Sequence, residues 1–386
     1  MSQPTRLGLY YGALFLGAGA ASPFIPTWFD HRGLTGAEIG LIMSIPMLAR
    51  TFTAPMMAMW ADSFRLRRTP LIWMALGLGA SYILLAAPFG FWWWMALWFC
   101  ASTLYASIIP LTDVIVLARS RADGFNYGWP RGIGSAAFIL ANIAMGVILA
   151  HTSPEMVLVW TTCAALLLAW GGRWFLPPDP VQESGAVVAL SDRLAGLKDL
   201  LKDRDFMLVV VSAGLIQSAH AFYYSFSTLA WRRQGIAEDM TGILWATGVV
   251  VEVAFLWFME PWRRKLGARN LLVLGGVAAV VRWVALAFSP PLWLLFPVQA
   301  LHTFSYAATF LGALQLVEKM SSPSNASAAQ TLNSALAGGV LSGLATIGSG
   351  WLFDSIGPRG YLAMAAMALL GLVGALGLYR VRRADD

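Results

Sequence analysis

Long apolar stretches separated by short polar segments recur along the whole chain. A bilayer-spanning helix needs about 20 mostly apolar residues, and twelve stretches meet that length. Stretches such as residues 201–221 show none of the alternation of apolar and polar positions that a transmembrane β-barrel requires. The pattern predicts an all-α integral membrane protein with twelve spans, at residues 6–29, 38–60, 70–89, 92–118, 129–150, 154–176, 206–230, 239–259, 270–289, 292–317, 327–352 and 358–379.

Composition supports the membrane interpretation. Of 386 residues, 58% are hydrophobic and only 12% charged, about half the charged fraction of a soluble domain. A soluble fold, a disordered chain and a fibrous repeat are therefore excluded. Cys100 and Cys163 lie inside apolar runs without a CxxC spacing, so neither a disulfide framework nor a zinc site is expected. We expect no metal and no cofactor.

The distribution of Lys and Arg predicts the topology. With the N-terminus in the cytoplasm, nineteen of the 26 Lys and Arg residues fall on the cytoplasmic side, four fall outside and three lie within spans. Cytoplasmic loops attract positive charge, so both termini are predicted to be cytoplasmic, and the basic excess does not indicate nucleic-acid binding. A signal peptide at the N-terminus is disfavoured, because the apolar run continues through residues 23–28 past the small residues at 18–21.

The longest connection divides the chain into two halves of six spans. It contains three prolines and then an apolar spacing typical of a surface helix, at Leu190, Leu194, Leu197, Leu200 and Leu201. After spans 2 and 8, Asp62 and Glu260 each precede a basic cluster, although any cytoplasmic helix end attracts basic residues. We predict two pseudo-symmetric six-helix bundles, 1–176 and 206–386, joined by a cytoplasmic linker at 177–205, which is the layout of major facilitator transporters.

Seven ionisable residues fall inside the predicted spans. A charge at the centre of a membrane helix costs about 2.5 to 3.5 kcal/mol, so these side chains must face one another or an aqueous cavity. A passage for a polar or ionic solute would satisfy that need. The seven are Arg50, Asp113, Arg131, His220, Glu252, Arg282 and His302.

Each of these residues also has a simpler interpretation. Asp113 and Arg131 flank one loop and could form a structural ion pair, and the two histidines could be packed and neutral. Glu252 is surrounded by apolar residues within 249–254, so burial would favour its protonated form and allow it to carry a proton. Arg50 and Arg282 stay cationic and could anchor an anion, since the guanidinium matches a carboxylate.

Aromatic residues follow His220 at Phe222, Tyr223, Tyr224 and Phe226, and Tyr306 lies one turn beyond His302. An apolar pocket with a few convergent polar groups is the usual form of a small-ligand site, although each ring could equally be ordinary packing. We therefore expect these aromatics to contribute to a substrate pocket.

Several motifs resemble the phenylpropionate permease family of the major facilitator superfamily, and residues 23–28 resemble the related lactose permease group. The likeness covers nearly the whole chain and rests on residues 48–50, 110–113, 127–128, 131–138, 217–224, 244–245, 248–253, 280–283 and 299–302.

The resemblance implies a proton-coupled symporter for a small organic solute, with an aromatic carboxylate such as 3-phenylpropionate as the expected substrate. Two departures matter. Ser63 and Arg65 stand where the superfamily loop signature has Arg and Gly, although Asp62 is present; and span 5 lacks the Gly-Pro signature of drug:proton antiporters, which disfavours export.

These observations predict a monomeric importer of the bacterial inner membrane that works by alternating access and is not an enzyme. Its partners are protons, the small-molecule substrate and the lipid bilayer. The alternatives are a symporter for a sugar or nucleoside, an efflux protein, and a sensor that does not transport. The roles are assigned as follows: proton coupling to Glu252, His220 and His302; substrate binding to Arg50, Arg282, Gln217, Tyr223 and Tyr224; gating or a charge pair to Asp62, Asp113 and Arg131.

Overall fold

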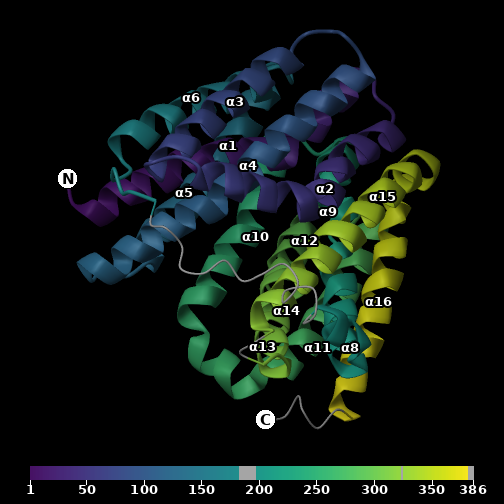
Figure 1. Ribbon diagram of the computed structural model, residues 1–386. Coiled ribbons are helices and arrows are strands. Elements are labelled where there is room, and N and C mark those ends of the chain that lie inside the picture. The colour runs from purple at the N-terminus through teal and green to yellow at the C-terminus, as the bar shows by residue number, and fades with distance from the viewer. Residues whose placement is uncertain (182–196, 323–324, 381–386) are drawn as a thin grey trace. The chain divides into compact units, whose positions relative to one another are not determined.

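The computed structural model describes residues 1–181, 197–322 and 325–380, and this part of the chain is built of helices (Figure 1). Eleven helical stretches of the described residues are long and apolar enough to cross a membrane. The last, Ala328–Arg380, contains the eleventh and twelfth predicted spans, which the short 3-10 turn η3 (Gly357–Gly360) separates. The predicted all-α membrane architecture is confirmed.

The described helices form two compact units. The first unit comprises Met1–Glu183 and Trp231–Ala246, and the second comprises Ser184–Ala230 and Thr247–Asp386. The helices up to residue 181 are α1 (Gln3–His31), α2 (Gly36–Asp62), α3 (Arg68–Leu85), α4 (Phe91–Asp123), α5 (Gly128–His151) and α6 (Met156–Trp174). Those that follow are α8 (Arg204–Ser218), α9 (Ala221–Arg233), α10 (Glu238–Phe258), α11 (Glu260–Ala287), α12 (Leu292–Ala300), η1 (Thr303–Ala308), α13 (Thr309–Met320), α14 (Ala326–Asn333), η2 (Ser334–Leu341), α15 (Ser342–Ile356), η3, α16 (Tyr361–Gly377) and η4 (Leu378–Arg380).

In the first unit, α1 packs on α5 and α6, and α3 packs on α4 and α6. The α1–α5 crossing is close, because a Cβ at Gly19 would lie 2.5 Å from the carbonyl oxygen of Phe138. Helix α2 begins with a capping box, in which the Thr35 side chain accepts from the Glu38 backbone and the Glu38 side chain accepts from the Thr35 backbone.

The chain just after α6 is fixed to the same unit. Residues 179–181 run antiparallel to the turn after α2, where Leu66 pairs with Pro180 and the Arg67 N–H donates to the Asp179 carbonyl over 2.9 Å. The Asp179 carboxylate also forms a two-bonded ion pair with Arg119 near the end of α4. Asp179 is thus bound through both its backbone and its side chain.

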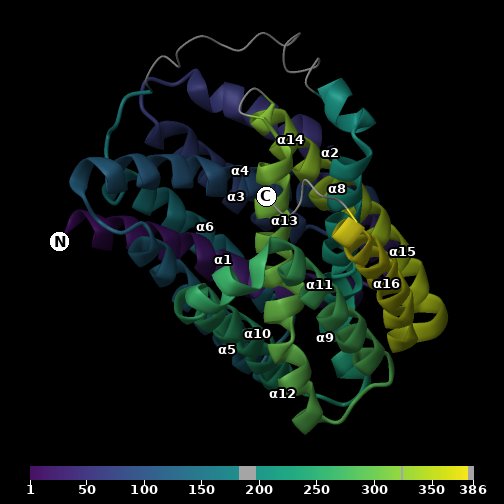
Figure 2. The ribbon, with the colours of Figure 1, turned by 90° about the horizontal axis from the view of Figure 1, so that it is seen from below.

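In the second unit, α11 packs on α13 and α16, and α8 packs on α16 (Figures 1 and 2). Gly312 permits the close contact of α13 with α11, because a Cβ there would lie 2.7 Å from the Ala268 carbonyl oxygen and 3.0 Å from the Leu272 nitrogen. Helix α11 itself is kinked at Gly267, whose φ of 77° is a left-handed conformation that glycine adopts without strain.

Three of the predicted spans are interrupted. Span 7 is divided at residues 219–220 between α8 and α9. Span 10 consists of α12, the π-helical segment η1 and α13, and span 11 contains the π-helical segment η2. Irregular backbone at membrane depth is tolerated where protein buries it, and π-helical turns occur frequently at functional sites.

The predicted linker at 177–205 is described only in part. Residues 197–202 are helical and Leu200 is buried, whereas Leu190 and Leu194 lie outside the described residues. The predicted boundaries of the two bundles and of the linker stay predictions.

Replacing Gly312 with alanine should lower the stability of the protein by about 1–3 kcal/mol, because the new methyl group would collide with backbone atoms of α11 that cannot move aside. Gly348→Ala is the control, since nothing lies within 4 Å of a Cβ at that position and alanine favours helix. Thermal unfolding of the two purified variants in detergent measures the difference. Equal melting temperatures would show that the α11–α13 contact is looser than the structure indicates.

Candidate functional site

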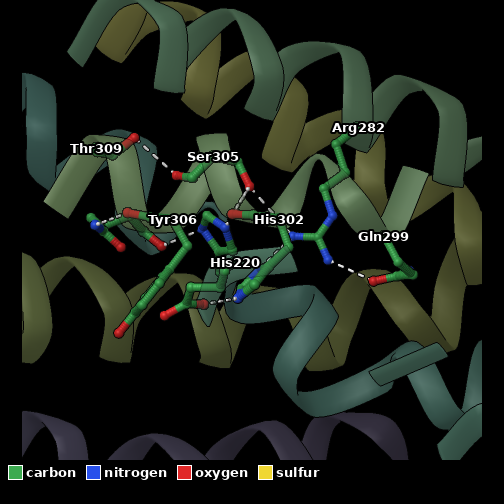
Figure 3. A network of polar contacts seen from close by, with 9 residues as sticks. His220, Arg282, Gln299, His302, Ser305, Tyr306 and Thr309 are labelled. Atoms are coloured by element: carbon green, nitrogen blue, oxygen red, sulfur yellow. Dashed lines mark hydrogen bonds and ion pairs between the residues drawn. The ribbon is translucent and has the colours of Figure 1, made fainter. Parts of the chain in front are cut away.

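Two buried histidines lie at the helix breaks of spans 7 and 10. His220 follows the last residues of α8, and His302 lies between α12 and η1. The two rings are 5.7 Å apart between centroids, and His220 is fully buried. Figure 3 shows both rings within one network of polar contacts that also includes Arg282, Gln299 and Ser305.

Hydrogen-bond partners determine the protonation pattern of His302. Its Nδ1 lies 3.0 Å from Arg282 Nη1, and because a guanidinium can only donate, Nδ1 must accept. The ring proton of a neutral His302 is therefore on Nε2, which lies 3.3 Å from the Glu252 carboxylate. His302 connects Arg282 to Glu252 and stays neutral while Arg282 occupies Nδ1.

Arg282 is fully buried. Its Nη2 donates to Gln299 Oε1 over 2.8 Å, and the guanidinium carbon lies 4.3 Å from the Tyr223 ring centroid and 4.7 Å from that of Trp283. The His302 ring lies between the Glu252 carboxylate and the guanidinium, and contacts both. The aromatic faces supply part of the compensation as cation–π contacts.

His220 is held from both sides. Its Nδ1 lies 2.9 Å from the Gln217 carbonyl oxygen, which can only accept, so Nδ1 carries a hydrogen. Its Nε2 lies 3.1 Å from Ser305 Oγ. The Gln217 side chain in turn donates to the Tyr306 carbonyl oxygen in η1 over 3.1 Å, which ties the break in span 7 to the π-helical segment in span 10.

Glu252 is the acidic member of the network and its more accessible end. Its side chain is 21% exposed, against 10% for His302 and complete burial for His220 and Arg282. Tyrosine rings surround the histidines: Tyr306 stacks on His302 with centroids 5.2 Å apart, Tyr224 stacks on His220, and Tyr223 lies against Arg282. The structure thus brings together all of the predicted residues of the second unit: Gln217, His220, Tyr223, Tyr224, Glu252, Arg282 and His302.

The predicted residues of the first unit lie in separate places. Asp113 on α4 accepts hydrogen bonds from the hydroxyl groups of Tyr11 and Tyr127. The Arg131 guanidinium lies over the rings of Phe15 and Tyr11, at 4.3 and 5.4 Å. Among the ion pairs between described residues there is none that joins Asp113 to Arg131; Tyr11 contacts both. Arg50 is exposed midway along α2, and Asp62 is exposed at its end.

Sequence reasoning did not assign a role to Gln299 or Ser305. Gln299 binds the guanidinium, and Ser305 lies among His220, Arg282 and the His302 carbonyl. Their signal in the sequence is the spacing of three residues that separates Gln299, His302 and Ser305, which places polar side chains on one side of a helix. No group of three or more metal-ligating side chains occurs in residues 1–181, 197–322 and 325–380.

The described helices form a helical membrane protein, and comparison with known families gives its class, a transporter of the major facilitator type. A family model described as the MFS_1 like family matches residues 5–363, and the chain belongs to that family of the major facilitator superfamily.

Known proteins agree with this assignment. The chain is 28% identical over 377 residues to a protein of Escherichia coli (strain K12) named "Probable 3-phenylpropionic acid transporter", covering 95% of this chain and 96% of that one. It is 26% identical to the "Maltose permease" of Geobacillus stearothermophilus, covering 99% and 96%. Among solved structures, the nucleoside transporter NupG superposes with a TM-score of 0.82 at 17% identity, covering 99% of this chain and 100% of that one, which supports the fold.

Arg282→Lys should destabilise the protein by about 2–4 kcal/mol, because an ammonium group cannot bond to His302 and Gln299 together and leaves buried acceptors unpaired. Arg264→Lys is the control. Arg264 bonds to Glu260 one turn away and is 80% exposed, so that exchange should cost less than about 0.5 kcal/mol. Denaturation in mixed micelles would compare the two. Similar losses in both variants would contradict the central role of Arg282 in the network.

Proposed function

We propose that the protein is a secondary active transporter that couples the uptake of a small organic anion to the uptake of a proton, with an aromatic carboxylate such as 3-phenylpropionate as substrate. The observation that carries the proposal is the chain of contacts from Glu252 through His302 to Arg282. The relative named for 3-phenylpropionic acid, which matches nearly the whole length of both chains, supports the substrate class.

Charge balance explains the coupling. While Glu252 is ionised, its charge offsets that of Arg282 through the neutral ring of His302. Protonation of Glu252 leaves the buried guanidinium without a counter-ion, and an isolated buried charge is costly. An anionic substrate then restores neutrality, so that a proton and an anion enter together and leave together.

The surroundings of Arg282 suit an anion. Trp283 Nε1 and Gln299 Nε2 are buried donors without a hydrogen-bond partner among the described residues, and neither atom can accept. Donors beside a guanidinium favour a carboxylate, and the rings of Tyr223, Tyr224 and Tyr306 offer faces for an aromatic group. Because Arg282 is fully buried, its contact with substrate requires the network to open during the transport cycle.

In this proposal the protein resides in the bacterial inner membrane as a monomer, with both termini in the cytoplasm and with alternating access to its site. Arg50 is assigned to the substrate path. Asp113 and Arg131, which share Tyr11 as a neighbour, are assigned to a charge switch together with Asp62 at the end of α2.

Glu252→Gln should abolish accumulation of 3-phenylpropionate driven by a pH gradient and should spare exchange of labelled for unlabelled substrate, because glutamine mimics the protonated acid and cannot release a proton. Proteoliposomes with an imposed pH difference provide the measurement, and Glu260→Gln, at an exposed acid, is the control. Persistent gradient-driven accumulation in Glu252→Gln would remove Glu252 from the coupling step.

A second candidate is the uptake of a sugar or nucleoside with a proton. The relative named maltose permease matches the chain over almost its full length, and Gln217, Gln299 and the tyrosine hydroxyls could bond to a polyhydroxylated solute.

Parallel uptake assays with labelled 3-phenylpropionate, maltose and uridine would separate these two functions. The anion proposal expects only the acid to accumulate, and expects that uptake to increase when the outside is made more acidic. Accumulation of maltose or uridine with no uptake of the acid would establish the second function.

A further inference from the structure

The Ser305 hydroxyl has a single hydrogen and two possible acceptors within the network. Ser305 is fully buried in η1. Its Oγ lies 3.1 Å from His220 Nε2, 3.2 Å from the His302 carbonyl oxygen and 3.4 Å from Arg282 Nη1 (Figure 3). A hydroxyl group has one hydrogen to donate and two lone pairs that accept.

Arg282 can only donate, so the Ser305 hydrogen points either to His220 Nε2 or to the His302 carbonyl. Since the hydrogen of neutral His220 is fixed on Nδ1 by the Gln217 carbonyl, neutral Nε2 is an acceptor and takes the Ser305 hydrogen. When Nε2 gains a proton it becomes a donor, and the same hydroxyl then accepts from it and turns its hydrogen to the His302 carbonyl. The His220 Nε2 atom and the Ser305 hydroxyl are therefore hydrogen-bonded to each other in both states.

We propose that Ser305 is a positioning residue for proton coupling, whose hydroxyl lets His220 gain and lose a proton while both nitrogens of its ring stay hydrogen-bonded. One N–H bond forms at Nε2 on protonation and breaks on release; Ser305 keeps its own hydrogen throughout. The inference deepens the proposed function, because it names His220 as a second proton site beside Glu252.

The hydrogen-bond geometry of the two rings favours His220 over His302 as the second proton site. His220 faces Tyr224 from α9, Trp283 from α11, and His302 and Tyr306 from span 10. The positive charge of Arg282 lies beyond Ser305, and the Glu252 carboxylate contacts the His302 ring. At His302 both ring nitrogens already face fixed partners, a guanidinium donor and a carboxylate acceptor, so a second proton there requires Arg282 to leave.

Nitrogen-15 NMR of the histidine-labelled full-length protein in lipid nanodiscs tests the inference without any substrate. The chain has four histidines, and His220→Gln assigns the signal of interest. Between about pH 8 and pH 5, the wild type should show a growing imidazolium signal for His220. Ser305→Ala should reduce that protonated fraction about tenfold, the ratio expected for loss of a hydrogen bond to a charged group.

Ser305→Thr, which keeps the hydroxyl, should restore the wild-type profile, and Ser305→Cys replaces the alanine variant if the latter is not monodisperse. Ser349→Ala is the matched control, since that serine is also fully buried and bonded one turn back to Ala345. A wild-type profile in Ser305→Ala, or a His220 that stays neutral in the wild type, would overturn the inference.

Uptake assays on the same variants separate this inference from the proposed function. Ser305→Ala should lose stimulation of 3-phenylpropionate uptake by a pH gradient and keep exchange, whereas Ser305→Thr should keep both. If the wild type transports no member of the substrate panel under a pH gradient, the proposed function fails, and the NMR profile still decides the role of Ser305.

Discussion

A guanidinium buried within a membrane protein must be compensated, and much of the second unit is organised around that requirement. Arg282 is fully buried, and three of its bonding partners, Gln299, His302 and Ser305, come from one region of span 10. Two aromatic rings lie against its carbon. Because His302 contacts both Arg282 and Glu252, the local charge depends on whether Glu252 is ionised. The protonation of Glu252 and the charge compensation of Arg282 are thereby linked through the His302 ring.

The broken helices make this arrangement possible. A regular α-helix bonds all of its interior backbone groups internally, and so leaves none for side chains. The break at residues 219–220 instead offers the Gln217 carbonyl to the His220 ring, and the π-helical segment η1 offers the Tyr306 carbonyl to the Gln217 side chain. These two bonds fix His220 and η1 relative to each other within the second unit. The irregular backbone thus supplies hydrogen-bond acceptors to the side chains of His220 and Gln217.

The sequence was sufficient to predict the helices and the proximity of the ionisable residues in the second unit. Spans were predictable because apolar length alone determines them, and the convergence of Glu252, Arg282 and the two histidines followed from the cost of charge in lipid. The helix breaks were not predictable, since nothing in residues 217–224 or 299–309 distinguishes a π-turn from an α-turn by periodicity. Ser305 was missed for a different reason: its spacing from His302 places it on the same side of the helix, but a serine in an apolar helix commonly bonds to its own backbone, and its contact with His220 depends on the tertiary structure.

Asp113 shows a second limit of sequence reasoning. Acidic and basic residues on either side of one loop suggest an ion pair, yet Asp113 is bonded by two tyrosine hydroxyls while Arg131 lies on aromatic faces. Helix packing determines which neutral groups contact a charged side chain. Here the packing of α1 on α5 brings Tyr11 and Phe15 to the Arg131 guanidinium. An argument from opposite charges alone does not take these neutral side chains into account.

The pairing of residues 179–181 with the turn after α2 affects the tether between the two halves of the chain. The sixth predicted span ends at residue 176, so the tether would start at residue 177. The first five residues of that tether, 177–181, are attached to the first unit. A fully extended chain covers at most about 3.4 Å per residue, so the attachment shortens the greatest reach of the tether by about 17 Å. The backbone pairing and the Arg119–Asp179 ion pair together hold this end of the connector, and every contact in that attachment lies within the first unit.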